Sequence, residues 1–95
     1  MSELRIEAEP TEDGCVRLRL EGRLDGGGAY ILRDRIATIG RPPIIIDFSR
    51  LEGLSDFGLG LLAMALGELG FEVQLVGVGH HAQRILQAFG ISLAA

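Results

Sequence analysis

The sequence predicts an α/β fold for residues 1–95: one domain with a mixed, mostly parallel sheet of four to five strands, an N-terminal β-hairpin and three helices. Two short N-terminal segments alternate apolar and polar residues, which is the period of a β-strand. Three later segments repeat apolar residues at helical spacing, and runs rich in β-branched residues precede two of them. The chain has 95 residues, which is the size of one domain.

The N-terminal part of the chain predicts the hairpin. Apolar side chains alternate with charged ones in both arms, at Leu4, Ile6 and Ala8 in the first and at Val16, Leu18 and Leu20 in the second. The stretch Thr11–Gly14 consists of turn-forming residues, so we expect the two arms to pair antiparallel. Each arm then has one buried face and one solvated face.

The first helix is predicted after a break in the pattern at Glu21–Gly28. Its apolar stripe is formed by Ala29, Leu32, Ile36 and Ile39. Asp25 is a candidate N-cap for this helix, and Gly40 ends it. Each of the three glycines after Asp25 costs about 1 kcal/mol relative to alanine inside a helix, which weakens the first turn.

The run Ile44–Ile46 predicts a strand that ends at Asp47. A continuous β-branched run is typical of a strand that is buried on both faces. We therefore expect helices above and below the sheet. The following stretch, Ser49–Leu54, is predicted to be a loop.

The C-terminal half predicts two further helices and at least one further strand. A helix over Phe57–Leu69 has its core face at Leu59, Leu62, Ala63, Leu66 and Leu69, and Gly70 ends it. Phe71–Val76 is predicted to be a strand. The last helix, His81–Phe89, has Ala82, Ile85, Leu86 and Phe89 facing inward and ends at Gly90. Ile91–Ala95 is either a short closing strand or a frayed end.

Composition argues against several classes of protein. The formal net charge is −4, and all nine basic residues are arginines spread along the chain, so we expect no nucleic-acid binding. The single cysteine, Cys15, forms neither an internal disulfide nor a multi-cysteine metal site. The N-terminus has no signal-peptide pattern, and the longest apolar stretch, Phe57–Gly67, is about half a membrane span. We expect a cytoplasmic protein without direct membrane insertion.

Three motif-like stretches do not support an enzyme or a cofactor site. Asp56-Phe57-Gly58 spells the magnesium tripeptide of protein kinases, but the chain contains no lysine and no other kinase motif. Gly77–Ala82 fits G-x-G-x-x-A, yet no acidic residue follows at the spacing of a dinucleotide site, which favours a tight turn over anion binding. His80 and His81 are adjacent and do not share a helix face as metal ligands. We predict no enzyme activity, no cofactor and no metal.

The stretch from Asp47 to Leu62 carries the strongest functional signal. It predicts a strand that ends in Asp47, a short loop, and a helix N-terminus with Ser55 and Asp56. The carboxyl ends of strands and the N-termini of helices are where α/β folds hold functional groups and favour negative charge. The simpler interpretation is that Ser55 or Asp56 only caps the helix.

These residues resemble the STAS domain, the family of anti-sigma factor antagonists and sulfate transporter C-terminal domains. The similar motifs are Leu18–Asp25 ("l-x-l-x-G-x-l-D"), Ile44–Ser49 ("v-v-l-D-l-S"), Leu54–Gly60 ("i-D-S-S-G-L-G") and Ala82–Ile91. The resemblance covers nearly the whole chain and implies the same order of elements. It also implies that Asp47, Ser49, Gly58 and Gly60 are structural residues of the motif.

The resemblance has a consequence for Asp56. In stand-alone bacterial members of the family, an anti-sigma serine kinase phosphorylates the first serine after the motif aspartate, which breaks the complex of the two proteins. By position, that serine is replaced by Asp56, the preceding aspartate by Ser55 and the second serine by Phe57. A fixed charge at Asp56 either locks the domain in a phosphorylated-like state that rejects the kinase, or meets a partner adapted to an acidic site. A third route shifts the phosphoacceptor to Ser55.

The function implied by the resemblance is a non-enzymatic regulatory module that binds an anti-sigma factor or serine kinase-like protein, with a homodimer as a further option. The expected partner-binding residues are Asp25, Gly26, Ser55, Asp56, Phe57, Gly58 and Leu61. One alternative is a STAS subunit of a larger assembly, such as a lipid-transport ABC complex or a stressosome-like array. Another is a STAS domain that binds a small ligand or nucleotide near Asp47 and Gly77–Ala82.

Overall fold

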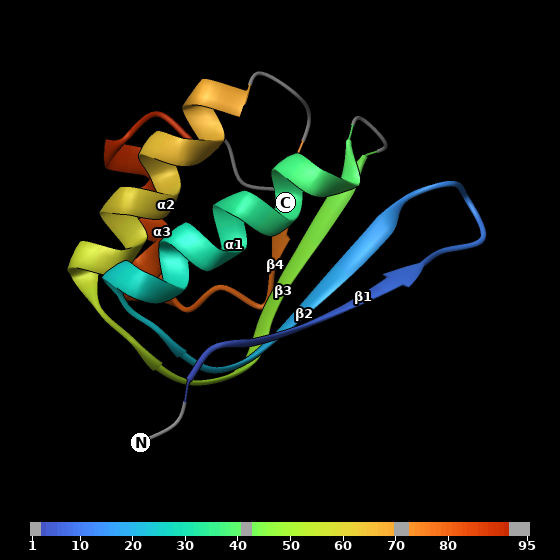
Figure 1. Ribbon diagram of the computed structural model, residues 1–95. Coiled ribbons are helices and arrows are strands. Elements are labelled where there is room, and N and C mark those ends of the chain that lie inside the picture. Colours follow the sequence, from blue (N-terminus) through green and yellow to red (C-terminus); the bar gives the residue numbers. More distant parts are fainter. Residues whose placement is uncertain (1–2, 41–42, 70–72, 92–95) are drawn as a thin grey trace.

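Four strands and three helices form the structure, a computed structural model that describes residues 3–40, 43–69 and 73–91 (Figure 1). In chain order they are β1 (Arg5–Pro10), β2 (Val16–Leu24), α1 (Gly26–Ile39), β3 (Ile44–Leu54), α2 (Asp56–Leu69), β4 (Val73–Val76) and α3 (His80–Ala88). The strands form one sheet in the order β1-β2-β3-β4. β1 is antiparallel to β2, whereas β2–β3 and β3–β4 are parallel pairs. The predicted fold class is confirmed.

The N-terminal hairpin forms as predicted, but the expected buried face of its first arm is incomplete, because Ile6 is half-buried and Ala8 is exposed. Ile6 lies opposite Leu20 and Ala8 opposite Leu18, so the apolar residues of both arms share one face. The backbone N–H of Thr11 donates a hydrogen bond of 2.9 Å to the carbonyl oxygen of Cys15, which closes the turn. Because the period of a strand is two, this register turns the charged residues of both arms to the other face.

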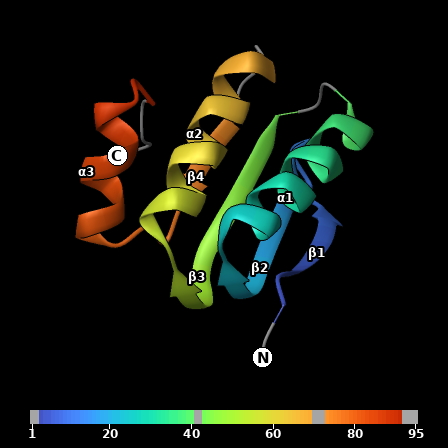
Figure 2. The same ribbon diagram turned by 60° about the vertical axis from the view of Figure 1, so that its left-hand side comes forward.

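The helices α1 and α2 lie over the same face of the sheet, and α3 packs beside α2 (Figure 2). The strand order explains this one-sided arrangement. The chain moves in one direction from β2 through β3 to β4, and crossovers between parallel strands are right-handed, so both connecting helices fall on the same face. The expectation of helices above and below the sheet is therefore wrong.

The burial of β3 reflects this arrangement. Ile44 and Ile46 are buried against the helices, whereas Ile45 faces the other way and is only half-buried. Three consecutive isoleucines carry no alternation, so the sequence pattern does not distinguish an open face from a covered one. Burial of this strand on both faces, which the isoleucine run predicted, is not observed.

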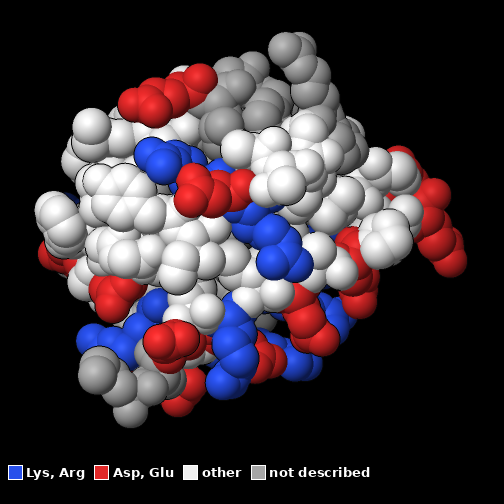
Figure 3. All heavy atoms as spheres, in the orientation of Figure 1, with Lys and Arg blue, Asp and Glu red and all other residues white. Residues whose placement is uncertain are grey.

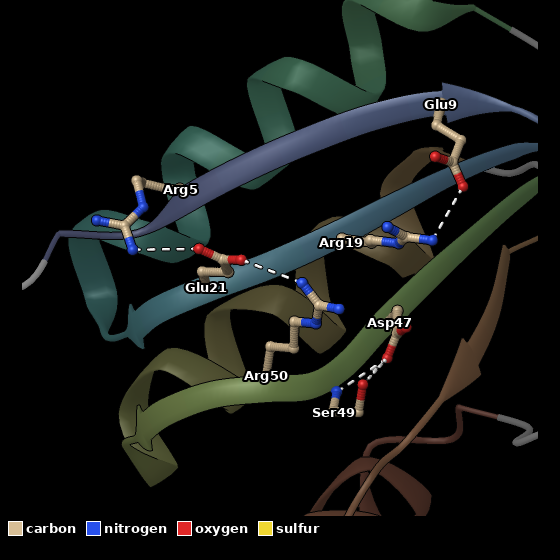
Figure 4. Close-up of polar contacts among 7 residues, drawn as sticks. All are labelled: Arg5, Glu9, Arg19, Glu21, Asp47, Ser49 and Arg50. Atoms are coloured by element: carbon tan, nitrogen blue, oxygen red, sulfur yellow. Dashed lines mark hydrogen bonds and ion pairs between the residues drawn. The ribbon is translucent and has the colours of Figure 1, made fainter.

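The open face of the sheet carries charged side chains that pair across strands (Figure 4). Glu21 on β2 contacts two arginines, at 3.1 Å from Arg5 Nη2 and 3.6 Å from Arg50 Nη1. Arg19 Nη2 lies 3.2 Å from Glu9 Oε1. Each solvent-exposed pair of this kind contributes about 0–1 kcal/mol, so these pairs keep the face soluble more than they stabilise it.

Two strands extend beyond their predicted ends. β2 continues through Leu24, so the first four residues of the predicted break at Glu21–Gly28 are strand. β3 continues through Leu54, so the predicted loop at Ser49–Leu54 is wrong over its whole length. The strands stay paired as far as Leu24 and Leu54, but their register shifts twice along the way. A bulge breaks the alternation without ending the strand. Gly22 adopts a φ of 90° at the second shift, a conformation that glycine reaches without steric cost.

The core lies between the sheet and the helices. Its largest fully buried side chains are Leu18, Leu20, Leu24, Leu32, Ile36, Ile44, Ile46, Leu59, Leu62 and Leu86. Phe89, which was predicted to face inward, is instead 53% exposed. It follows the last turn of α3, and its ring lies over Gly60 of α2, where a Cβ atom would be 3.4 Å from the Cζ atom of the ring.

Two helix starts differ from prediction by one residue. α1 begins at Gly26, directly after the predicted cap, Asp25. α2 begins at Asp56 and α3 at His80, each one residue earlier than predicted. The predicted end of α2 at Gly70, the first two residues of the predicted strand Phe71–Val76, and most of the predicted closing segment Ile91–Ala95 lie outside the described residues.

Candidate functional site

Two helix N-termini lie side by side at one end of the sheet. β2 and β3 are parallel neighbours whose last residues, Leu24 and Leu54, pair with each other, so the helices that follow them start at the same edge. The backbone N–H of Ser55 donates a hydrogen bond of 3.1 Å to the carbonyl oxygen of Leu24, which joins the two junctions. The sequence predicted both junctions as partner-binding segments, and the fold brings them together.

Each of the two helices has a side-chain cap. The backbone N–H of Gly28 donates to Asp25 Oδ1 over 2.8 Å at the start of α1. The backbone N–H of Gly58 donates to Ser55 Oγ over 2.9 Å at the start of α2. The prediction that Asp25 caps α1 is confirmed, and of the two cap candidates for α2 it is Ser55 that serves. Ser55 is half-buried and its oxygen already accepts this bond, so a phosphoryl group on Ser55 would disturb the cap.

Gly58 lets the first turn of α2 approach the chain before α1. A Cβ atom at position 58 would lie 2.7 Å from the carbonyl oxygen of Leu24 and 2.8 Å from that of Asp25. These separations are shorter than any ordinary carbon–oxygen contact, so only glycine fits without moving the backbone. The structural role that the family motif implies for Gly58 has this physical basis.

Phe57 lies across Gly26, the first residue of α1. A Cβ atom on Gly26 would be 2.8 Å from Cε2 of the Phe57 ring and 3.6 Å from Cδ1 of Leu61. The ring is nevertheless 71% exposed, the highest value among the exposed large hydrophobic residues described. A flat aromatic surface therefore covers the start of α1 and remains open to solvent.

Asp56 lies in the first turn of α2, next to Phe57, with a side chain that is 69% exposed. Its Oδ1 atom is 3.0 Å from Nε2 of His81, which belongs to the first turn of α3. The unpaired N–H groups of a helix start favour a carboxylate by about 0.3–1 kcal/mol. Asp56 thus places a carboxylate at the surface. The N-terminus of α2 favours its negative charge, and His81 of α3 contacts it.

Sequence reasoning missed the contribution of His81. It treated His80 and His81 as a pair that does not bind metal and did not connect either of them with Asp56. The two partners are 25 residues apart in the chain, and only the packing of α3 against α2 brings them together. No spacing rule for helices or strands covers such a distance, so the sequence held no signal for this contact.

Asp47 and Ser49 lie apart from the paired helix starts. They are on β3, on the open face of the sheet (Figure 4), where the backbone N–H and the hydroxyl of Ser49 donate to Asp47 Oδ1 over 2.9 Å and 2.6 Å. The prediction that the strand ends at Asp47 is wrong. β4 pairs with β3 only as far as Asp47, opposite Val76, but β3 continues along β2.

The Asp47 carboxylate is held in its charged form. The hydroxyl of Ser49 is the main cause that lowers the pKa of Asp47 below its ordinary value, and the backbone N–H of Ser49 and the guanidinium groups of Arg17 and Arg19 act in the same direction. Partial burial opposes them. Arg17 Nη1 lies 3.5 Å from Asp47 Oδ2. The two hydrogen bonds from Ser49 therefore hold the Asp47 carboxylate in place within the strand.

The segment Gly77–Ala82 forms the tight strand-to-helix turn that the sequence favoured. Gly77 has a φ of 70°, and Gly79 precedes the first turn of α3. The space beside this turn, lined partly by Gly77 and Gly79, measures about 180 Å³. Ligand pockets usually measure about 300–1,000 Å³, so this space is small for a nucleotide.

A shallow groove of about 100 Å³ runs between α1 and α2. It is lined by Ala29, Tyr30, Arg33, Leu61, Met64, Ala65 and Glu68. Among the described residues, no three His, Cys, Asp or Glu side chains are arranged to hold a metal ion. None of the helices in these residues combines the length and the apolar character needed to cross a membrane.

The fold and the paired helix starts define a class of small α/β domain, and comparison with known proteins identifies its family. The model of the family described as "Mlab, STAS domain" matches residues 7–92. The chain therefore belongs to the STAS domain family. No curated protein matches the sequence.

Solved structures agree with this assignment. An anti-sigma factor antagonist from Mycobacterium paratuberculosis is 26% identical, with a TM-score of 0.70 over 93% of this chain and 79% of that one. The anti-sigma factor antagonist SpoIIAA in its unphosphorylated form is 23% identical, with a TM-score of 0.67 over 96% of this chain and 88% of that one. The Bacillus cell fate determinant SpoIIAA in the phosphorylated form is 24% identical, with a TM-score of 0.62 over 90% of this chain and 84% of that one. At these identities the two SpoIIAA structures establish the fold.

Proposed function

We propose that this chain is a regulatory STAS module of the anti-sigma factor antagonist type. It forms a single cytoplasmic domain and acts by binding an anti-sigma factor or serine kinase-like protein rather than by catalysis. The proposed contact residues are Asp25, Gly26, Ser55, Asp56, Phe57, Gly58 and Leu61. One observation carries the proposal: Phe57 is 71% exposed beside the exposed carboxylate of Asp56, where two helix starts with side-chain caps meet.

The chemistry of this surface suits protein recognition. Exposed aromatic side chains on a rigid support are typical anchors of protein interfaces, because they bury a large area at a small entropic cost. Gly26 leaves room for the ring of Phe57 to lie against the start of α1, and a charged neighbour adds orientation and selectivity. The structural similarity to proteins described as anti-sigma factor antagonists supports the class of partner.

Asp56 distinguishes this module from phosphorylated relatives. A carboxylate carries about −1 charge, whereas a phosphoserine carries about −1.5 to −2 and three acceptor oxygens. His81 lies 3.0 Å from Asp56 and offsets part of that charge when it is protonated. We propose that Asp56 is a constitutive charge at the phosphoacceptor position and that the partner recognises it without a phosphorylation cycle.

Affinity capture with mass spectrometry tests this function. The immobilised chain should retain a protein with the histidine-kinase fold from a lysate of its source organism. Phe57→Asp should reduce that retention at least tenfold, because it places a charge where the ring is proposed to be buried. Ile31→Asp is the matched control, since Ile31 is 53% exposed but does not belong to the proposed contact surface. Equal loss for both variants, or no loss, contradicts the proposal.

The constitutive charge has its own test. After incubation with the retained kinase and ATP, the intact mass of the chain should remain unchanged. A phosphate on Ser55 would contradict a constitutive site and favour the shifted acceptor.

A second candidate is a STAS subunit of a larger assembly, for which phosphorylation is dispensable. It is favoured by the same proposed replacement of the family's acceptor serine, since the exposed residue in the first turn of α2 is Asp56. Retention of an ATPase or a permease in the capture experiment, again lost in Phe57→Asp and kept in Ile31→Asp, would select this function over the first.

A further inference from the structure

The α2 helix has two apolar faces. One faces the sheet and contains Leu59, Leu62, Ala63 and Leu66, which are all buried. The opposite face is formed by Phe57, Leu61 and Met64, spaced by four and three residues, with Glu68 four residues further on. At 3.6 residues per turn these positions fall on one line along the solvent side of the helix. We call this line of Phe57, Leu61 and Met64 the outer stripe.

The outer stripe is open to solvent and borders the groove between α1 and α2. Phe57 is 71% exposed and Met64 57% exposed, while Leu61 is half-buried. Tyr30 on α1, itself 50% exposed, forms the far wall of the groove. Figure 3 shows a broad uncharged surface over α2 and the beginning of α1.

The dimensions of the groove favour a helix over a small molecule. A volume of about 100 Å³ is well below that of a ligand pocket and suits the tip of a side chain. Phe57 and Met64 are two helical turns apart, which corresponds to a rise of about 10 Å along the axis. Side chains of a second helix at positions i, i+4 and i+7 would interleave with such a stripe.

The charges around the stripe select the kind of helix. Asp56 lies at one end and Glu68 at the other, about 18 Å apart along α2. The cation that lines the groove, Arg33, is turned toward α1 itself: its Nη2 atom lies 3.1 Å from Asp34 Oδ1 and its guanidinium carbon 5.0 Å from the centre of the Tyr30 ring. The two ends of the stripe therefore favour basic side chains on an occupant.

We propose that the outer stripe and the α1–α2 groove bind a basic amphipathic helix of the protein partner. This inference rests on the proposed function and adds the chemistry of the partner: apolar residues at helical spacing that contact Phe57, Leu61 and Met64, and Lys or Arg residues that meet Asp56 and Glu68. Burial of the stripe supplies most of the affinity, and the terminal charges supply orientation.

A synthetic helix tests the stripe directly. The probe is a peptide of about 18 residues with leucines on one face and lysines on the other, and its control carries glutamates in place of the lysines. The lysine peptide should bind the full chain about tenfold more tightly than the glutamate peptide at low salt. It should shift the NMR signals of residues lining the α1–α2 groove.

Paired variants make the result specific. Met64→Glu should weaken binding of the lysine peptide at least tenfold, because it removes an exposed apolar contact of the stripe, whereas Ile31→Glu adds the same charge elsewhere and should leave the affinity within about twofold. Equal effects of the two variants, or signal shifts confined to the charged face of the sheet, would overturn the inference. So would a concentration-dependent dimer that Met64→Glu abolishes, since a second copy would then cover the stripe.

The captured partner separates this inference from the proposed function. Loss of the partner with Phe57→Asp together with unchanged retention in Met64→Glu would leave the proposed function standing and overturn the outer-stripe inference. Loss in both variants is the expected result.

Discussion

The carbonyl oxygen of Leu24 lies where a side chain at position 58 would begin: a Cβ atom on Gly58 would be 2.7 Å from it. Leu24 ends β2 and Gly58 is in the first turn of α2, so this contact sets how closely α2 approaches the start of α1. The spacing of the two helix starts at the candidate site depends on this packing.

Gly58→Ala should therefore destabilise the fold. Overpacking of this kind typically costs about 1–3 kcal/mol, which exceeds the gain of about 1 kcal/mol from replacing glycine by alanine within a helix. The same substitution at Gly67, also on α2, meets nothing within 4 Å and should stabilise the fold by about 0.5–1 kcal/mol. Urea denaturation of both variants measures the difference, and the same sign of change for both would contradict the close approach.

The two helix caps should contribute separately. Asp25→Ala and Ser55→Ala each remove one acceptor for a backbone N–H and should each lower the free energy of unfolding by about 0.5–2 kcal/mol. Asp34→Ala, at an exposed position inside α1, serves as the control and should change the free energy of unfolding by less than about 0.5 kcal/mol. Thermal melts followed by circular dichroism are sufficient, and a control as destabilised as the cap variants would refute the capping roles.

Asp47 should make stability depend on pH in the acid range. Its pKa in the folded chain lies below the ordinary value of 3.8, so on acidification the unfolded chain takes up this proton first. The stabilisation is fully present above the ordinary pKa and is lost as the pH falls through the lower, folded value. The gap in unfolding free energy between the native chain and Asp47→Asn should thus narrow below about pH 4.

Ser49→Ala provides the matched comparison for Asp47. The Ser49 hydroxyl is the main cause of the lowered pKa, so an NMR titration of this variant should place the Asp47 pKa closer to its ordinary value. An unchanged titration of Asp47 in Ser49→Ala would show that the arginines rather than Ser49 hold the carboxylate.

The contact between Asp56 and His81 should contribute little to stability. Both side chains are more than two-thirds exposed, and exposed ion pairs typically contribute about 0–1 kcal/mol. A double-mutant cycle with Asp56→Asn and His81→Gln should give a coupling below about 1 kcal/mol that decreases with added salt. A larger coupling would mean that the pair holds α3 in place rather than only tuning the charge of Asp56.

Much of the fold was predictable from the sequence because its signals are local. The alternation of Leu18 and Leu20 and the helical spacing of Leu32 and Ile36 identified the hairpin and α1 before any packing was known. Asp25 was recognisable as a cap because a cap acts within three residues of itself. The segments that form the candidate site were likewise identified, through their resemblance to family motifs.

The errors arose where neighbouring strands decide the outcome. The isoleucine run Ile44–Ile46 is compatible with helices on one face or on both faces of the sheet. Both crossovers run in the same direction, so the helices cover one face only. The continuation of β3 to Leu54 depends on bulged pairing with β2, which breaks the alternation that sequence patterns detect. The contact of Asp56 with His81 depends on how α3 packs against α2.

The sequence by itself determined the order of the elements, most of their types and the cap of α1 at Asp25, and the resemblance to family motifs identified Asp56 as a candidate site residue. Capping hydrogen bonds and side-chain periodicity depend on residues that are close together in the chain, so they can be predicted from the sequence. The tertiary structure alone decided that Phe57 lies over Gly26, that His81 reaches Asp56, and that the outer stripe of α2 faces solvent between its neighbours. The first two relationships join residues far apart in the chain, and the exposure of the stripe depends on which side of α2 its neighbours cover, so all three exist only once the helices pack on the sheet.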